Sequence, residues 1–540
     1  MRINVTFFLT FLSLFISSIT SLTAQHYDPD FFPIGVWSVR GDFRTVEDHL
    51  YDVNKAAASH HEHFSDLHAR GFNAAFMSLD PIVYTLDTIL DIAFENDIKI
   101  IANMSNTHYL LSGGSGNPNI TGDDIRQAML DDSIFLLKNS PATLGYYIYD
   151  EPLPGWIDFD ILAQAKDTML SLTGGNHPIL STWNDVLSMD YIDGYLDLDV
   201  LMMDAYPLSD STTEGSLIDY MPAYFSSYGD SDFPETIGPA TPSFSEYIEQ
   251  VRKEQCSENN RPFWAVFQSF GDAVTYDANN PDAAWAFWRQ VKPKEIRLQA
   301  WIAVMQGAKG LWYFLYESEY PVLLGMLDLD GQPTARLEEA TSVNAEINKI
   351  SPILLRLKVD EVASNLSVDR GEARLHEDSQ LTSGNKYVIV TNTDYDASND
   401  IEVRVQKSAL NYVVKGVFDE LSEVSIPFTE TSDEIIFVVS LDRATGSLFH
   451  LSEMPLAGDE VIADSKLILF PNPASDFIYL QSYGKKVDEI QIINNLGQLV
   501  FEDLAPGNKL DIHLLSKGVY FVNIIMDHQS FVRKIIVDKN

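Results

Sequence analysis

Residues 146–152 have the sequence Tyr-Tyr-Ile-Tyr-Asp-Glu-Pro, an apolar and aromatic run that ends in two acids and a proline. A short continuous apolar run is typical of a parallel strand that is buried on both faces. Pro152 ends the strand, so Asp150 and Glu151 lie at its carboxyl end. In a (β/α)8 barrel the active site lies at this end of the strands. The stretch therefore predicts a barrel strand that leads into a site; the alternative is a pair of solvated turn acids.

The chain on both sides of this stretch alternates strand-like and helix-like segments from residue 31 to about residue 352. The alternation predicts a (β/α)8 barrel, because an open dinucleotide-binding sheet would need a Gly-x-Gly-x-x-Gly turn after its first strand, and none is present. The eight expected strands are Phe32–Val39, Phe72–Leu79, Ile98–Met104, Thr143–Tyr149, Ile179–Thr182, Val200–Asp204, Phe263–Gln268 and Gly310–Tyr316. The expected helices include Val53–Ala69, Ile125–Leu137, Ile157–Leu172, Glu295–Ala308 and Glu338–Ile350.

The composition excludes some classes of function. The chain has 540 residues, a formal net charge of -42 and 45% hydrophobic residues, so we expect folded domains throughout. Nucleic-acid binding is not expected, because phosphate contacts need clustered Lys and Arg. Cys256 is the only cysteine, which excludes an intramolecular disulfide.

The N-terminus has the pattern of a signal peptide. Arg2 precedes the apolar stretch Val5 to Ile19, and small and polar residues follow up to Ala24. This pattern predicts removal of residues 1–24 and export of the mature protein. No later segment has 18 unbroken apolar residues, so no stable membrane span is expected.

Carboxylates, amides and aromatic rings follow the expected barrel strands. Aromatic faces stack on the C–H faces of sugars, amides and acids bind hydroxyls, and two carboxyls together can break a glycosidic bond. For any one aromatic residue, core packing is the competing explanation. The predicted catalytic residues are Glu151 and Asp204, and the predicted substrate-binding residues are Trp37, Asn103, His108, Tyr147, Asp150, Trp183, Asn184, Tyr206, Gln268, Trp312 and Glu317.

The expected barrel resembles the clan-A type of (β/α)8 glycoside hydrolases. The resemblance covers about 320 residues and rests on residues 32–37 (Phe-Pro-Ile-Gly-Val-Trp), 145–152 (Gly-Tyr-Tyr-Ile-Tyr-Asp-Glu-Pro), 203–207 (Met-Asp-Ala-Tyr-Pro), 264–268 (Trp-Ala-Val-Phe-Gln) and 306–314 (Gln-Gly-Ala-Lys-Gly-Leu-Trp-Tyr-Phe). Only the Asp-Glu-Pro motif among these is distinctive. The resemblance implies that Glu151 is the acid/base after the fourth strand, and that a glutamate nucleophile follows the seventh.

The sequence departs from that pattern at the seventh strand, where Gln268 occupies the nucleophile position. Three alternatives are open. Asp204, which we prefer, could activate a water in an inverting reaction if it lies roughly 6.5–9.5 Å from Glu151. Glu317 could fill the same role, or the substrate could supply its own nucleophile with Asp150 orienting it. A general acid also needs a raised pKa, which neighbouring Asp150 and partial burial would give Glu151. Strand alternation predicts that Asp150 and Glu151 point in opposite directions, so that one of them is structural.

No metal or cofactor is expected. His60, His61 and His63 surround Glu62, but helical spacing places only some of them on one face, which favours a solvated helix surface. A Gly-x-Ser-x-Gly elbow, a P-loop and a His-Glu-x-x-His motif are all missing from the sequence.

After residue 353 the pattern changes to short strands with two-residue alternation, which predicts a β-sandwich over residues 354–456. The expected strands are Lys386–Thr391, Asp400–Val405, Asn411–Val417, Glu434–Val439 and Ser447–Leu451. All-β domains of this kind often follow glycosidase barrels, so we expect it to pack against the barrel; carbohydrate binding is the alternative.

Residues 464–540 form a third expected module, a small β-sandwich. Its motifs are Leu-Phe-Pro-Asn-Pro-Ala at 469–474, Asn-Leu-Gly-Gln at 495–498, Leu-Ser-Lys-Gly-Val-Tyr-Phe at 515–521 and Lys-Ile-Ile-Val at 534–537. They closely resemble the C-terminal sorting domain of type IX secretion, the alternative being a terminal adhesive domain. The resemblance implies the type IX secretion machinery as a partner and a secreted or cell-surface location.

These features predict a secreted glycoside hydrolase that cleaves an environmental poly- or oligosaccharide, with Glu151 as general acid. A non-catalytic carbohydrate-binding protein on a degenerate barrel is the alternative, because the seventh-strand glutamate is missing.

Overall fold

The computed structural model separates the chain into two compact units, Met1–Leu456 and Ala457–Asn540. It describes residues 27–37, 53–78, 86–113, 119–152, 157–183, 196, 198–208, 243–256, 261–272, 288–318, 323–379, 386–453, 468–470, 474, 477–481, 487, 489–494, 499–503, 509–526, 529–537 and 539. The expected signal peptide over residues 1–24 lies outside the described residues.

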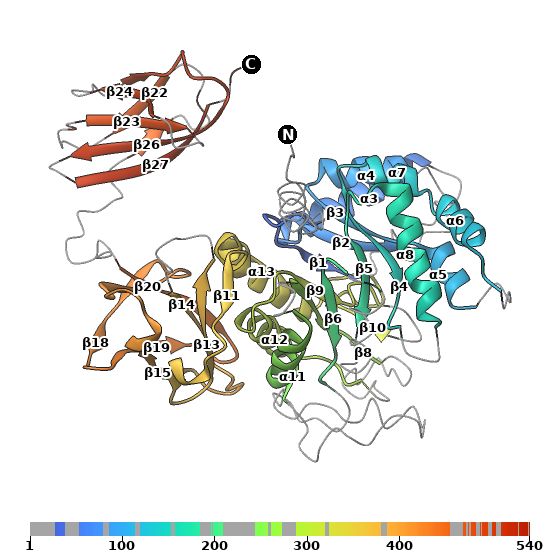
Figure 1. The fold of residues 1–540 in the computed structure, drawn as a ribbon, viewed down its shortest axis with the longest axis horizontal. Coiled ribbons are helices and arrows are strands. Elements are labelled where there is room, and N and C mark those ends of the chain that lie inside the picture. Colours follow the sequence, from blue (N-terminus) through green and yellow to red (C-terminus); the bar gives the residue numbers. More distant parts are fainter. Residues whose placement is uncertain are drawn as a thin grey trace, which may run out of the picture. The chain divides into compact units, whose positions relative to one another are not determined.

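Eight parallel strands close into a barrel in the first unit (Figure 1). The barrel closes because the last strand pairs with both the seventh and the first. This confirms the predicted barrel, and the fourth and seventh strands have the predicted bounds. In order, the strands are β1 (Ile34–Val36), β2 (Ala74–Ser78), β3 (Lys99–Asn103), β4 (Thr143–Tyr149), β5 (Ile179–Trp183), β6 (Leu201–Ala205), β7 (Phe263–Gln268) and β9 (Leu311–Phe314).

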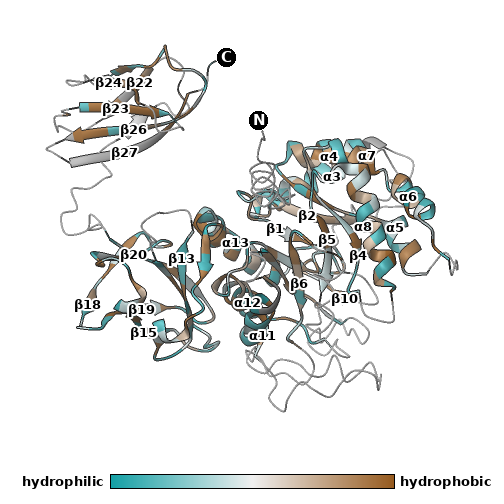
Figure 2. Cartoon of the chain, viewed as in Figure 1, coloured by the Kyte–Doolittle hydropathy of each residue, from teal (hydrophilic) through white to brown (hydrophobic). Residues whose placement is uncertain are grey.

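The described helices cover the outside of the barrel, and Figure 2 shows that α6 and α8 mix hydrophilic and hydrophobic segments, as expected of covering helices. The single helix predicted over Ile125–Leu137 is two helices, because Ser133 between them has a left-handed φ of 58°. The helices are α3 (Val53–Ala69), α4 (Leu86–Glu95), α5 (Ser105–Leu111), α6 (Gly122–Asp131), α7 (Ile134–Asn139), α8 (Phe159–Thr173), α11 (Phe244–Val251), α12 (Pro293–Met305) and α13 (Ala335–Leu354).

Side chains of the barrel strands alternate between the barrel interior and the layer beneath the helices. On β6, Met202 belongs to the interior cluster, whereas Met203 and Ala205 belong to the cluster that includes the helices. By the same alternation, the side chain of Asp204 points into the barrel interior. Residues at the carboxyl end of each strand therefore reach the site only if they lie at the inward positions.

The predicted sandwich consists of a six-stranded and a four-stranded antiparallel sheet. Lys386–Thr391 is a strand as predicted, but residues 411–415 are not: the strand there is Gly416–Asp419, which pairs with Gly446–Ser452. The six strands are β11 (Leu357–Val359), β13 (Glu372–Asp378), β14 (Lys386–Thr391), β20 (Gly446–Ser452), β16 (Gly416–Asp419) and β17 (Val424–Ile426). The four are β12 (Leu366–Val368), β15 (Asn399–Gln406), β19 (Glu434–Leu441) and β18 (Phe428–Glu430).

Helix α12 lies between the barrel and the sandwich and is buried all round. Every residue from Glu295 to Met305 is buried, which explains why α12 lacks a polar face. Tyr387 and Leu448 of the six-stranded sheet belong to the same hydrophobic cluster as the barrel core. The sandwich therefore completes the core of the barrel unit, as expected for a packing domain.

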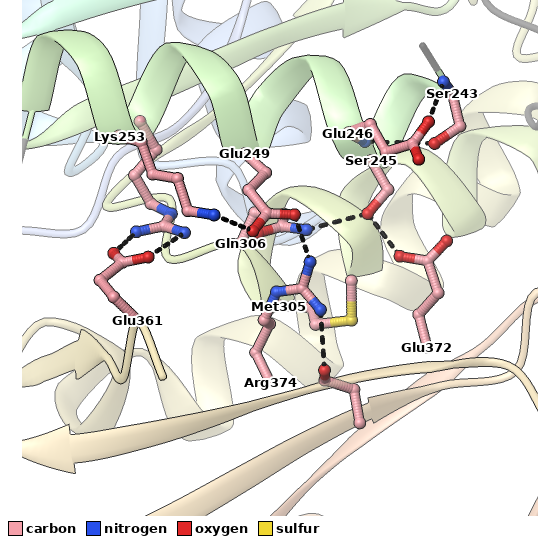
Figure 3. A network of polar contacts seen from close by, with 12 residues as sticks. Ser243, Ser245, Glu246, Glu249, Lys253, Met305, Gln306, Glu361, Glu372 and Arg374 are labelled. Atoms are coloured by element: carbon pink, nitrogen blue, oxygen red, sulfur yellow. Dashed lines mark hydrogen bonds and ion pairs between the residues drawn. The ribbon is translucent and has the colours of Figure 1, made fainter. Parts of the chain in front are cut away.

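A polar seam joins the same two parts (Figure 3). Ser245 on α11 donates to Glu372 on β13 at 2.5 Å and accepts from Nε2 of Gln306 at 2.9 Å. Arg374, also on β13, donates to Glu249 of α11 at 2.5 Å. Burial raises the pKa of Glu372 although the Ser245 hydroxyl opposes the shift. The seam fixes the orientation of β13 against α11.

We expect Gly446→Ala to destabilise the first unit, because the contact between β20 and α12 leaves no room for a methyl group. An added Cβ would lie 2.6 Å from the ring of Trp301 and 2.9 Å from the carbonyl oxygen of Val390. Overpacking of this kind costs about 1–3 kcal/mol. Urea unfolding measures the loss, with Gly122→Ala as control, because its nearest neighbour lies at 3.5 Å. Equal stability of the two variants would contradict this packing.

The second unit contains a three-stranded and a four-stranded antiparallel sheet around a core of its own. The strands of the first are β21 (Ile468–Phe470), β22 (Phe477–Gln481) and β25 (Lys509–Asp511), and those of the second are β24 (Leu499–Asp503), β23 (Glu489–Asn494), β26 (Gly518–Met526) and β27 (Gln529–Val537). In the part of the chain that the structure describes, no helix is long and apolar enough to cross a membrane.

Candidate active site

Asp150 is fixed by two hydroxyls at the carboxyl end of β4. Oδ1 of Asp150 lies 2.5 Å from the hydroxyl of Tyr147 and 2.8 Å from that of Thr182, and the two hydroxyls lie 2.5 Å from each other, so the three groups form one hydrogen-bonded cluster. Tyr147 and Thr182 are both buried, and Leu180 on the same strand as Thr182 belongs to the interior cluster. The carboxyl group of Asp150 is therefore held rigidly while its residue stays exposed.

Glu151 follows in a left-handed backbone conformation, with φ of 43°. This conformation is rare for a residue with a side chain, and such strain is typical of functional sites. The turn changes the direction of the chain just after the strand has ended. Asp150 contacts Thr182, and Glu151 contacts Asp204, so both acids meet inward-facing residues. The expectation from alternation, that one of the two acids points away, is wrong.

Asp204 is hydrogen-bonded to the side chain of Glu151 and is only 3% exposed. Burial raises the pKa of Asp204 well above its usual range, and the charges of Glu151 and Asp150 raise it further. Two carboxyls in contact share a proton, because both cannot ionise cheaply. Oδ1 of Asp204 has no hydrogen-bond partner among the described residues. Burial and the neighbouring acids therefore both favour the protonated form of Asp204.

The contact between Asp204 and Glu151 does not fit the role predicted for Asp204. An inverting pair needs roughly 6.5–9.5 Å between the carboxyls to hold a water and the sugar between them. Hydrogen-bonded carboxyls are far closer than this separation. This contact leaves no room for a water and a sugar between the two carboxyls, so the geometry does not favour the water-activating role predicted for Asp204.

The side chain of Gln268 is hydrogen-bonded to the backbone. Its side-chain Nε2 donates to the carbonyl oxygens of Leu208 at 3.0 Å and Phe270 at 3.3 Å, and its Oε1 accepts from the N–H of Leu208 at 2.9 Å. The residue is 0% exposed. The predicted substrate contact of Gln268 does not fit this arrangement, because its amide already ties the segment after β6 to the end of β7.

Three predicted aromatic platforms are core residues. Trp183 faces outward from β5 and packs on Phe159 of α8, and it is 0% exposed. Trp312, also 0% exposed, fills the barrel interior opposite Gly35, where any Cβ would meet its ring at 2.3 Å. Trp37 stacks on Phe76 with ring centroids 4.0 Å apart and is 7% exposed. Core packing, the competing explanation, is the better one for all three rings.

Tyr206 is the predicted aromatic residue that remains half-buried. Its ring lies 5.8 Å from Trp288, 5.6 Å from Phe314 and 5.1 Å from Phe270. Trp288 and Phe314 are half-buried as well. We call Tyr206 and these three rings the aromatic wall. It lies on the side of the barrel formed by β6, β7 and β9.

The remaining predicted residues are His108, Asn103, Glu317 and Asn184. His108 on α5 stacks on Tyr149 with centroids 4.9 Å apart, and burial lowers its pKa although the charge of Asp150 opposes this. Asn103 ends β3 beside Tyr147 of β4 in the register of the sheet. Glu317 follows β9 and is half-buried. Asn184 lies outside the described residues.

Thr182 and Trp288 contact predicted site residues, Asp150 and Tyr206, but were not themselves predicted. Thr182 has an inward position on β5, and the two-residue alternation from Leu180 could have identified it. Trp288 precedes α12 in an irregular segment, where periodicity gives no signal. No group of three or more His, Cys, Asp or Glu that could hold a metal ion occurs among the described residues.

The comparisons with known proteins identify the C-terminal unit. Residues 468–538 match the family model described as a secretion system C-terminal sorting domain. The chain ends in a secretion sorting domain. This domain marks the protein for type IX secretion, so the protein is secreted or displayed at the cell surface. No curated protein matches the chain.

Solved structures of glycoside hydrolases are similar to the chain at low identity. Alpha-L-fucosidase isoenzyme 1 from Paenibacillus thiaminolyticus is 10% identical, with a TM-score of 0.42 over 80% of this chain and 97% of that chain. The alpha-fucosidase of Thermotoga maritima is 11% identical, with a TM-score of 0.41 over 79% and 96%. The beta-glucuronidase of Ruminococcus gnavus is 12% identical, with a TM-score of 0.37 over 58% and 50%. At these scores, function must be judged from the side chains of the site.

Proposed function

We propose that the protein is a secreted glycoside hydrolase in which Glu151 is the general acid. The observation that supports this best is the hydrogen-bonded pair of Glu151 and Asp204 inside the carboxyl end of the barrel. A pair that contains a carboxyl with a raised pKa, here Asp204, is typical of acid/base sites at this end of a barrel. The aromatic wall offers half-buried rings on which a sugar can stack.

In this mechanism the pair holds one proton near neutral pH, where an isolated carboxyl would be ionised. Glu151 lies nearer the exposed end of the site than Asp204, which is buried. Glu151 therefore passes the proton to the glycosidic oxygen as the bond to the anomeric carbon breaks. Asp204 accepts or returns the proton within the pair and so keeps Glu151 protonated between turnovers.

The main alternative is a non-catalytic carbohydrate-binding protein. The sequestered amide of Gln268 favours it, because no carboxylate occupies that seventh-strand position. An enzyme would cleave the glycan that it binds, whereas a binding protein would only hold it. Incubating the purified protein with a panel of oligo- and polysaccharides and measuring new reducing ends tests the proposal. Hydrolysis that Glu151→Gln abolishes supports the enzyme, and binding of a glycan without any release supports the binder.

We expect Asp204→Asn to move the basic limb of the pH profile of kcat/KM to lower pH. In the native pair, loss of the last proton leaves two adjacent negative charges, which raises the pKa of that step; an amide at position 204 removes this repulsion. The maximum rate should also be lower. Asp123→Asn on the surface of α6 is the matched control. An unchanged basic limb would remove Asp204 from the proton-sharing role.

A further inference from the structure

We infer that the proposed hydrolase acts on β-linked 2-acetamido-2-deoxy sugars, whose acetamido oxygen serves as the nucleophile while Asp150 holds the acetamido N–H. The inference rests on the proposed function and specifies its substrate class. It follows from where the acids of the site lie and from which oxygen of Asp150 is already bonded.

Asp150, Glu151 and Asp204 lie together at the carboxyl end of the barrel. A retaining pair of carboxyls needs roughly 5–5.5 Å across the sugar and an inverting pair roughly 6.5–9.5 Å. Among the acids that the structure describes here, Asp204 is hydrogen-bonded to Glu151, which leaves no room for a sugar between them, and Asp150 is held by Tyr147 and Thr182. Gln268, at the seventh-strand position, is an amide bonded to the backbone. A nucleophile from the substrate fits this arrangement.

Asp150 has the geometry of a carboxylate that orients a ligand. Both hydroxyl bonds, from Tyr147 and Thr182, go to Oδ1. Oδ2 takes part in neither bond, and the residue is exposed. Two buried donors thus fix the plane of the carboxylate and leave its second oxygen for a donor of the substrate. An amide N–H is such a donor, and accepting its hydrogen bond makes the amide oxygen more nucleophilic.

The reaction is balanced without a protein nucleophile. The acetamido carbonyl oxygen bonds to the anomeric carbon, the bond from that carbon to the leaving oxygen breaks, and the proton of Glu151 goes to the leaving oxygen. The product is a cyclic oxazolinium ion whose N–H remains hydrogen-bonded to Asp150. Water then attacks the anomeric carbon, gives its proton to Glu151 and reopens the ring, which restores the acetamido group.

The direction from which the acetamido oxygen attacks fixes the configuration at the anomeric carbon. The oxygen of a C2 substituent reaches the anomeric carbon only from the face opposite the leaving group, so the two groups must be trans. In sugars of the gluco and galacto series this requires a β-linkage. Two successive inversions give a product that retains the β-configuration. The acetamido group is also held beside the reacting carbon, which gives the high effective concentration of an intramolecular nucleophile.

The first test uses 4-methylumbelliferyl β-glycosides of N-acetylglucosamine and N-acetylgalactosamine, with the matching 2-hydroxy glucoside and galactoside. We expect hydrolysis of at least one acetamido substrate and none of its 2-hydroxy counterpart. Replacing the acetyl by a trifluoroacetyl group should lower kcat by about 10²-fold or more, because fluorine withdraws charge from the attacking oxygen. Glu151-dependent hydrolysis of the 2-hydroxy substrates at similar rates would overturn this inference and leave the proposed function intact. Cleavage of neither series, together with Glu151-dependent release of reducing ends from another glycan, would overturn the inference alone. No release from any glycan would overturn both.

The second test concerns Asp150 itself. We expect Asp150→Asn to lower kcat on the acetamido substrate by about 10²-fold, and Thr182→Val, which keeps the carboxylate but removes one anchor, by about tenfold. Asp123→Asn should match the native enzyme. If Glu317 were a protein nucleophile instead, a 2-deoxy-2-fluoro-β-glycosyl fluoride would add the mass of one sugar to the intact protein. Such an adduct, absent from Glu317→Gln, would overturn the inference.

Discussion

Glu151→Gln should lower kcat on a phenyl glycoside by about 10³-fold and leave KM nearly unchanged, because glutamine has the size of glutamate but no proton to give to the leaving oxygen. The same variant should lose far less on a 2,4-dinitrophenyl glycoside, whose leaving group departs without protonation. This contrast separates a general acid from a residue that only supports the fold.

The control for this prediction is Glu95→Gln, which changes an exposed glutamate at the end of α4 and should hydrolyse both substrates like the native enzyme. Circular dichroism of Glu151→Gln should match that of the native protein. An equal loss on the phenyl and dinitrophenyl glycosides would show that Glu151 does not protonate the leaving group.

Gln268→Glu should destabilise the protein rather than restore the nucleophile expected at this position. A carboxylate there would place an oxygen against the carbonyl oxygens of Leu208 and Phe270, in a site that is 0% exposed. Leaving a buried charge unpaired costs about 3 kcal/mol or more. Urea unfolding at pH 7 measures the loss, and no gain in hydrolysis is expected.

The effect of Gln268→Glu should depend on pH. Burial would raise the pKa of the new carboxyl in the folded state above its unfolded value, so the loss of stability grows as pH rises from about 4.3 toward that folded pKa. Near pH 4 the protonated carboxyl can donate one hydrogen bond, and most of the loss should vanish. Gln332→Glu, at an exposed position just before α13, is the matched control. A stable, more active Gln268→Glu would contradict the backbone role of Gln268.

The barrel could be predicted from the sequence because its strands are short apolar runs with clear ends. Residues 143–149 and 263–268 have the predicted bounds, since both faces of each strand are buried and no polar residue interrupts the run. The predicted strand Asn411–Val417 begins too early, because its residue-by-residue pairing with Gly446–Ser452 begins only at Gly416.

The site was predicted less completely than the fold. The position of Glu151 at the end of β4 followed from the apolar run, but its contact with Asp204 depends on a left-handed residue that no periodicity indicates. Trp183 and Trp312 were assigned to the substrate because aromatic rings serve cores and sugars equally well. Only the direction of each strand position separates the two roles, and the outward position of Trp183 places it in the helix layer.

The most direct measurement compares native protein and Glu151→Gln for glycan binding and for release of reducing ends on the same glycan panel. Our account predicts that both bind at least one glycan with similar affinity, and that only the native protein releases new reducing ends. Binding by both without release by either would contradict it and identify a carbohydrate-binding protein on a barrel that has lost its chemistry.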